Sequence, residues 1–226
     1  MELRYARFHA FTQLLRPFSA WARRRRMATL LRIARVREGM SVLDLGGAPQ
    51  IWNYPFIPSL NITILNLPGK IEKSSESQHR FRYLEGDACR VEGVADQSFD
   101  FVFSNSVIEH VGDAERQLAF AREARRVGKG YWIQTPAVWF PIEAHTGMPF
   151  WWFYPESLKK ALIERWRAKL PVWTEMIETT RVIGRSDLAK MFPDATILVE
   201  RVSGIPKSYT AYRIPVIDPR GQRDQA

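Results

Sequence analysis

The alternation of apolar and polar stretches along the chain predicts a regular succession of strands and helices. Short apolar runs with the length and residue types of buried strands stand at Ser41–Leu45, Ile62–Asn66, Arg82–Leu84, Phe99–Ser104 and Tyr131–Thr135. Between the last two runs, Glu115–Val127 carries apolar residues at helical spacing and is closed by Gly128. Because strands that alternate with helices usually pair in parallel, the pattern indicates an α/β fold.

The segments on either side of these runs have different patterns. Residues 5–37 have apolar residues at helical spacing before and after Pro17, which predicts one or two helices. After Thr135, aromatic residues and prolines crowd into Pro136–Tyr154. The elements expected beyond this stretch are a helix from Glu156 to about Ala168, an apolar run at Arg181–Ile183, a short helix over Ser186–Phe192, and strands over Thr196–Val202 and Lys207–Arg213.

Length and composition agree with one domain. The 226 residues are 46% hydrophobic and 25% charged, which is ordinary for a globular chain. We divide the chain into a basic helical extension (1–37), a domain (38–213) with an aromatic-rich insertion at about 136–170, and a flexible polar tail (214–226). The single cysteine excludes a disulfide framework and a cysteine-based zinc site, and we expect no metal.

The net charge of +9 is concentrated near the N-terminus. Residues 1–40 hold ten arginines and two glutamates, whereas the rest of the chain is nearly neutral. The run Arg23–Arg26 is typical of a solvated helix face; the alternative is contact with an anionic membrane surface, and nucleic acid is disfavoured because no RNA-binding motif accompanies it. No apolar run has the length of a membrane span and no signal-peptide core is present, so we expect a cytoplasmic protein whose membrane contact, if any, is peripheral.

The strongest chemical signal is Val42–Pro49, with the sequence VLDLGGAP. Asp44 lies inside an apolar strand, and the small residues Gly46, Gly47 and Ala48 follow at its carboxyl end, where open α/β sheets bind ligands. A dinucleotide site would need a third glycine to seat a pyrophosphate, which a carboxylate at this place would repel. The motif therefore favours a ligand that is cationic or carries hydroxyl or amine groups.

Polar residues also mark the next three strand ends. Asn66 ends the second strand, where a ribose-reading side chain is expected. Asp87 follows the third strand in the segment EGDA, and the fourth strand ends in the small polar residues Ser104, Asn105 and Ser106. The carboxyl edge of the predicted sheet thus gathers the candidate ligand-binding side chains.

Together, the segments VLDLGGAP, EGDA, FDFVFSNSVIEHV and DLAKMFPDA resemble the class I S-adenosylmethionine-dependent methyltransferases, in the broad group labelled type 11. The resemblance extends from about Met27 to Arg213. It implies a Rossmann-like seven-stranded sheet, mostly parallel with an antiparallel last strand and with helices on both faces. It also implies S-adenosylmethionine as the cofactor, bound over the edges of strands one to four.

Carried over by position, the resemblance assigns the methionine and ribose portion of the cofactor to Asp44, Gly46 and Ala48, with Gly47 in the same loop. Asn66 would face the ribose hydroxyls. The chain departs from the family in lacking the usual Gly-x-Gly-x-Gly loop and in having Asn66 where an acidic residue is usual. Since an amide lacks the charge-assisted hydrogen bond of a carboxylate, cofactor binding weaker by about 1 kcal/mol is one expectation. The equal alternative is a shifted register in which another polar residue serves the ribose.

The resemblance assigns the other end of the cofactor to the third and fourth strands. Asp87, with Ala88 beside it, would face the adenine amino group. Ser104 and Asn105 would form the rim nearest the sulfonium.

A proton acceptor is needed only if the acceptor atom must lose a proton. The candidates are His110 with Glu109 after the fourth strand, and Glu143 with His145 after the fifth. For Glu109 and His110, a helix-capping role is the stronger interpretation, and for the other pair a loop salt bridge is an equal alternative. The aromatic stretch around Glu143 predicts a lid over the acceptor side.

We therefore expect a methyltransferase that moves a methyl group to an oxygen or nitrogen atom of a small-molecule, glycan or lipid-linked acceptor. One alternative is an RNA or protein methyltransferase that uses the basic N-terminal helix. Another is a non-catalytic binding module that retains the fold.

Overall fold

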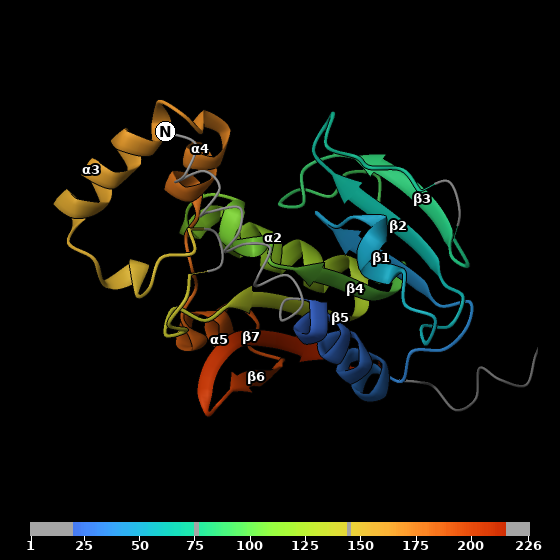
Figure 1. Cartoon of the computed structure of the whole chain (residues 1–226). Helices are drawn as coiled ribbons and strands as arrows, with labels where there is room; N and C mark the ends of the chain where they lie inside the picture. The colour runs from blue at the N-terminus through green and yellow to red at the C-terminus, as the bar shows by residue number, and fades with distance from the viewer. Residues whose placement is uncertain (1–19, 75–76, 144–145, 216–226) are drawn as a thin grey trace, which may run out of the picture.

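The computed structural model describes residues 20–74, 77–143 and 146–215, which form one seven-stranded sheet (Figure 1). The strand order is β3-β2-β1-β4-β5-β7-β6. The strands are β1 (Ser41–Leu45), β2 (Asn61–Asn66), β3 (Arg80–Glu85), β4 (Phe99–Asn105), β5 (Gly128–Pro136), β6 (Thr196–Val202) and β7 (Ile205–Arg213). β7 pairs antiparallel with both β5 and β6, and the other pairs are parallel. The predicted Rossmann-like, mostly parallel sheet is confirmed.

Helices cover both faces of the sheet. The first, described over residues 20–34 and here called the N-terminal helix, lies on one face, and α2 and α5 lie on the other (Figure 1). The longer helices are α2 (Ala114–Val127), α3 (Glu156–Arg167), α4 (Pro171–Thr179) and α5 (Arg185–Met191). The described residues also form short 3₁₀ turns at η1 (Pro49–Trp52), η2 (Ile108–His110) and η3 (Trp151–Phe153).

The two-residue period of β1 decides which side chains meet the N-terminal helix. Leu43 and Leu45 point to the face of α2 and α5, whereas Val42 packs in the cluster that contains Met27 of the N-terminal helix. Asp44 stands two residues after Val42, and successive side chains of a strand alternate between faces. Its carboxylate is therefore on the face covered by the N-terminal helix.

The structure differs from the expected element order in three places. Within the described residues, no α-helix connects β1 to β2, β2 to β3 or β3 to β4, so the N-terminal helix covers the face that such a helix would occupy. The expected run Arg181–Ile183 forms neither a helix nor a strand: the N–H of Arg181 donates to the carbonyl of Glu109 (2.7 Å), and Ile183 is buried in the core. The sequence interpretation missed α4, which begins at Pro171, a residue suited to the first helical position.

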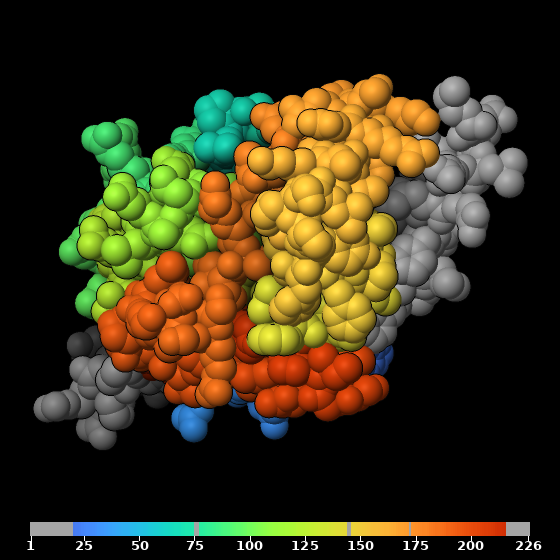
Figure 2. Space-filling view, turned by 90° about the vertical axis from the view of Figure 1, so that its left-hand side faces the viewer, coloured from blue at the N-terminus to red at the C-terminus, as the bar shows by residue number. Residues whose placement is uncertain are grey.

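The aromatic insertion forms a lobe with α3 and α4, which stands beside α2 and next to the outer strands β6 and β7 (Figure 2). Trp151 is buried, its ring centroid lies 5.6 Å from that of Trp166, and Trp166 lies 5.2 Å from Trp173. The ring centroids of Trp139 and Phe153 lie 5.0 Å apart, and at least half of the surface of each residue is exposed. The aromatic residues are thus both the core of the lobe and part of its surface.

Among the described residues, no helix is both long enough and apolar enough to cross a membrane.

Candidate functional site

The site is built around Asp44, a carboxylate buried at the carboxyl end of β1. The indole N–H of Trp52 donates to its Oδ2 (2.8 Å). Trp52 is held in turn by an edge-to-face contact with Phe103 (ring centroids 4.8 Å apart) and by His79, whose Nε2 lies 3.0 Å from the Trp52 carbonyl. The other oxygen, Oδ1, is buried and has no hydrogen-bond partner within the described part of the chain. Asp44 is therefore fixed in place with one oxygen left to bind a ligand.

Burial dominates the charge state of Asp44. Loss of solvation raises the pKa of its carboxyl from 3.8 to about 7, against the smaller opposing effect of the Trp52 hydrogen bond. A buried carboxylate with one unsatisfied oxygen is costly, and a cation or an N–H donor at Oδ1 would offset that cost. The site is consequently suited to a ligand that carries an ammonium group.

The loop after β1 can approach this carboxylate only because it begins with two glycines. A Cβ on Gly47 would lie 1.9 Å from Oδ2 of Asp44, and a Cβ on Gly46 would lie 2.6 Å from Cγ1 of Val107. Gly46 also has φ of +70°, a conformation that favours glycine. Both glycines are therefore required by contacts that the loop makes with the site.

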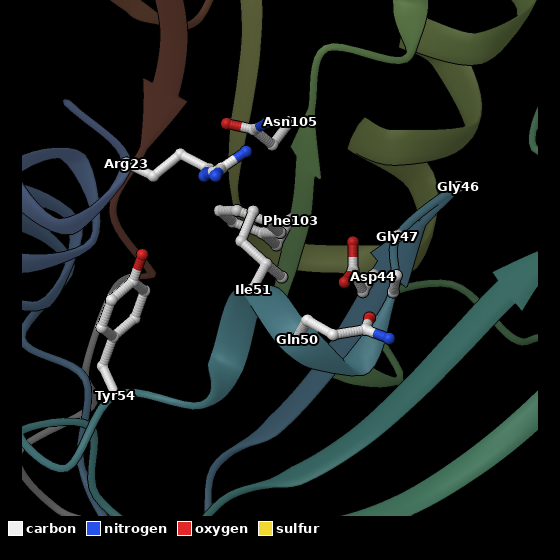
Figure 3. A pocket seen from close by; sticks show the side chains of 10 residues that line it. Arg23, Asp44, Gly46, Gly47, Gln50, Ile51, Tyr54, Phe103 and Asn105 are labelled. Carbon is white, nitrogen blue, oxygen red and sulfur yellow. The ribbon is translucent and has the colours of Figure 1, made fainter. Parts of the chain in front are cut away.

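A cavity of about 350 Å³ opens from this loop toward the N-terminal helix (Figure 3). Figure 3 shows the carboxylate of Asp44 on one side and the guanidinium of Arg23, near Asn105, on the other. Arg23 makes no ion pair with any described residue. The complete lining is Arg23, Asp44, Gly46, Gly47, Ala48, Gln50, Ile51, Tyr54, Phe103 and Asn105. A carboxylate and a guanidinium thus face one cavity from two separate elements.

A row of polar residues on neighbouring strands anchors the N-terminal helix beside this cavity. Arg26, whose side chain is only 8% exposed, pairs with Glu200 of β6 (2.8 Å) and donates to Asn105 of β4 and Gln134 of β5. Ser208 of β7 donates to the same Glu200 oxygen (2.7 Å). Because Asn105 uses its amide oxygen to accept from Arg26, its NH₂ group is the part able to donate to a ligand.

The arginine run Arg23–Arg26 is therefore not a uniform solvated face. Arg26 is buried in the network and Arg23 lines the cavity. Arg24 and Arg25 are exposed, and their guanidinium carbons lie over the rings of Phe56 (5.7 Å) and Trp21 (5.5 Å).

Of the residues proposed for the cofactor, Asp44, Gly46, Gly47, Ala48 and Asn105 line the cavity. Ser104 does not: it points to the opposite face, where its hydroxyl donates to the Leu45 carbonyl (3.0 Å). Ala88 packs against the core on the side of α2.

Asn66 and Asp87 lie at the neighbouring strand ends, outside the lining of the cavity. Asn66 is beside the glycine loop, with its Nδ2 at 3.4 Å from the Gly47 carbonyl. Asp87 pairs with Arg116 (2.8 Å) and accepts from the N–H of Cys89. Burial raises the pKa of Asp87, but these hydrogen bonds outweigh that effect and leave the pKa below its ordinary value. Asp87 therefore remains charged and partnered.

The proposed proton acceptors also lie outside the lining of the cavity. Glu143 is buried and its carboxylate accepts from the N–H of Thr146, which fixes a turn of the insertion. Nδ1 of His110 lies 3.1 Å from the hydroxyl of Thr180. His145 lies outside the described residues. No group of His, Cys, Asp and Glu side chains in the described ranges could hold a metal ion.

Sequence reasoning missed Arg23, Gln50, Ile51, Tyr54 and Phe103 as cavity residues, and Trp52 as the partner of Asp44. Phe103 could have been predicted: it is paired with Asp44 in the β1–β4 ladder, and the side chains of paired residues lie on the same face of the sheet. Arg23 offered no such signal, since its position depends on how the N-terminal helix docks.

Comparisons with known proteins agree with this architecture. Residues 62–130 match a family described as "Methyltransferase domain". No curated protein sequence matches the chain.

Among solved structures, Haemonchus contortus phosphoethanolamine N-methyltransferase 2 is similar in its complex with phosphomonomethylethanolamine and S-adenosylhomocysteine (TM-score 0.54) and in its complex with S-adenosyl-L-methionine (TM-score 0.52). Each is 14% identical, and each match covers 85% of this chain but 53% of the other, so this chain spans about half of that protein. A S-adenosylmethionine-dependent methyltransferase from Aquifex aeolicus is 16% identical, with a TM-score of 0.47 and coverage of 84% and 89%.

The strand order, the antiparallel β7 and the glycine loop after β1 define the fold as that of the class I S-adenosylmethionine-dependent methyltransferases. The match of residues 62–130 to the methyltransferase-domain family, of the type 11 group, agrees with this fold.

Proposed function

We propose that the chain transfers a methyl group from S-adenosylmethionine to an oxygen or nitrogen atom of a small-molecule, glycan or lipid-linked acceptor. The observation that carries the proposal is the buried Oδ1 of Asp44, which has no partner in the described chain and faces the same cavity as Arg23. The amino-acid end of S-adenosylmethionine carries an ammonium and a carboxylate. These two groups match the opposite charges of the two side chains.

The residues present fit this cofactor. Asp44 would accept from the ammonium, which is a stronger hydrogen bond than a neutral one. Arg23 would donate to the carboxylate, and the missing Cβ of Gly47 leaves the space in which the Asp44 carboxylate lies. When bound, S-adenosylmethionine supplies a methyl group already activated by the sulfonium. The main task of the chain is then to align the acceptor with the S–CH₃ bond and to exclude water.

Residues on the sheet face that the N-terminal helix covers would help to align the acceptor. Arg26 holds the amide of Asn105 in one orientation at the rim of the cavity, and Glu200 and Gln134 hold Arg26 in turn. The aromatic lobe stands next to the outer strands and offers Trp139 and Phe153 to an acceptor with an apolar or sugar-like part. The exposure of these two aromatic side chains is what supports an acceptor with an apolar or sugar-like part.

Calorimetric titration with S-adenosylmethionine tests the proposal. We expect binding with an affinity that depends on pH through Asp44, whose pKa is about 7. Below pH 7 the carboxyl is protonated, so the dissociation constant at pH 6 should be about tenfold weaker than at pH 8. Absence of binding at both values would contradict the proposal, and binding without turnover on any acceptor would favour the non-catalytic module.

Arg23→Gln tests the role of the guanidinium. We expect about tenfold weaker binding of S-adenosylmethionine, because a charge-assisted hydrogen bond to a carboxylate is lost. Methylthioadenosine has the nucleoside thioether but no amino-acid end, so its affinity should not change. The matched control is Arg24→Gln, which alters a neighbouring exposed arginine outside the cavity. Equal losses for both ligands would exclude contact between Arg23 and the carboxylate.

A further inference from the structure

A second cavity lies on the outer side of Arg26, between the N-terminal helix and the edge strand β6. Its volume is about 210 Å³. Arg25, Thr29 and Arg32 are spaced along one side of the helix, so their side chains reach the cavity together. Arg201 joins them from β6, directly after an irregularity in the β6–β7 pairing between Glu200 and Arg201. Such bulges commonly redirect a side chain at a sheet edge.

The rim of this basic pocket (Arg25, Arg32 and Arg201) has no carboxylate to balance it. None of the three forms an ion pair within the described ranges: Arg25 lies over Trp21, and Arg201 donates to the carbonyl of Gly204 (2.9 Å). The single carboxylate in the lining is Glu200, which already pairs with Arg26 and accepts from Ser208. The pocket is therefore electropositive and open to an anion.

The floor of the pocket is apolar, in contrast to its rim. Trp132, Leu198 and Val199 line it from β5 and β6. Trp21 is 49% exposed on the same helix, one turn before Arg25. A cationic rim over an apolar floor, with an exposed tryptophan beside it, suits an amphiphilic anion. Tryptophan is enriched at the bilayer interface, and arginine is attracted to anionic headgroups.

We propose that the basic pocket and Trp21 form a docking surface for an anionic phospholipid bilayer, with the lipid phosphate held by Arg25, Arg32 and Arg201. This assignment differs from the Arg23–Arg26 contact expected from the sequence, because two of those four side chains are turned toward the cofactor cavity and the buried network. It does not depend on methyl transfer.

Co-sedimentation of the full chain with vesicles tests the proposal. Binding is expected to vesicles of phosphatidylcholine mixed with phosphatidylglycerol, to weaken at high salt, and to be lost on pure phosphatidylcholine. The variant Arg25→Gln/Arg32→Gln/Arg201→Gln should bind about 100-fold more weakly, since each basic residue near an anionic surface contributes about fivefold. The matched control is Arg82→Gln/Arg122→Gln/Arg185→Gln, which removes the same charge from exposed positions on β3, α2 and α5. It should bind as wild type.

Equal losses in the two triple variants would overturn the proposal, because net charge alone would then explain binding. Two further arms separate a bilayer from other anions. Soluble glycerol phosphate should not displace the protein from the vesicles, and displacement at low concentration would assign the pocket to a free phosphate ester instead. Tighter retention of a single-stranded RNA than of vesicles at the same salt concentration would also overturn the assignment. Circular dichroism and thermal melting confirm that each variant is folded.

Discussion

Asp44→Asn should abolish cofactor binding and at the same time stabilise the protein at pH 8. The loss of affinity should be at least about 100-fold, because the ammonium of the cofactor would lose its buried counter-charge. The gain in stability follows from the raised pKa. The folded state holds the Asp44 proton more tightly than the unfolded chain, so stability falls as the pH rises from 3.8 to about 7 and the full cost remains above pH 7.

The difference between 3.8 and about 7 corresponds to about 4 kcal/mol of unfavourable ionisation. Asparagine has no charge to bury, so this cost disappears. Its amide N–H is left without a partner, which is itself unfavourable, so we expect the free energy of unfolding to increase by about 2 kcal/mol in total. Chemical denaturation at pH 8 and at pH 4 measures the effect. The gain should be present at pH 8 and absent at pH 4, where the wild-type carboxyl is protonated in the folded state. If the variant is no more stable than wild type at pH 8, the ionised Asp44 carboxylate does not destabilise the folded protein.

Gly47→Ala should have the second largest effect, through the same carboxylate. The three atoms nearest to the added Cβ all belong to Asp44, at 1.9, 2.1 and 2.2 Å, so the carboxylate must leave its place and its hydrogen bond with Trp52. We expect destabilisation of about 2 kcal/mol, as for other overpacked sites, and loss of detectable cofactor binding by calorimetry.

A double-mutant cycle isolates the contact. In an Asp44→Ala background the atoms that the new Cβ strikes are absent, so Gly47→Ala should then cost little stability. Gly184→Ala is the matched control: its Cβ would meet Oδ2 of Asp187 at an ordinary 3.6 Å and it lies outside the cavity. Additive losses in the cycle would mean that the glycine is required for another reason.

The sheet could be predicted because each strand is a local pattern. Apolar runs identified β1, β2, β4 and β5 closely, and the runs near the C-terminus located β6 and β7. Asp44 stood out because a carboxylate inside an apolar strand is rarely structural, and its burial with one free oxygen agrees with that reasoning.

Features that depend on contacts between distant segments could not be predicted from local sequence patterns. Arg23 and Arg26 look alike in the sequence, yet one lines the cavity and the other is buried against Glu200. Their different roles follow from the rotation of the N-terminal helix on the sheet. The pairing of Asp87 with Arg116 likewise joins two elements whose approach is set by the tertiary fold.

The N-terminal helix covers part of the core with Met27 and Leu30, and it also supplies Arg23 to the cavity. A ligand that binds both Arg23 and the residues of β1 therefore links this helix to the sheet. The helix can leave the sheet only if the contact between Arg23 and the ligand is broken. Ligand release and helix undocking are thermodynamically linked. Protection of the Met27–Leu30 amides from hydrogen exchange should rise as the cavity fills, so these amides would report occupancy of a site that the helix touches through Arg23.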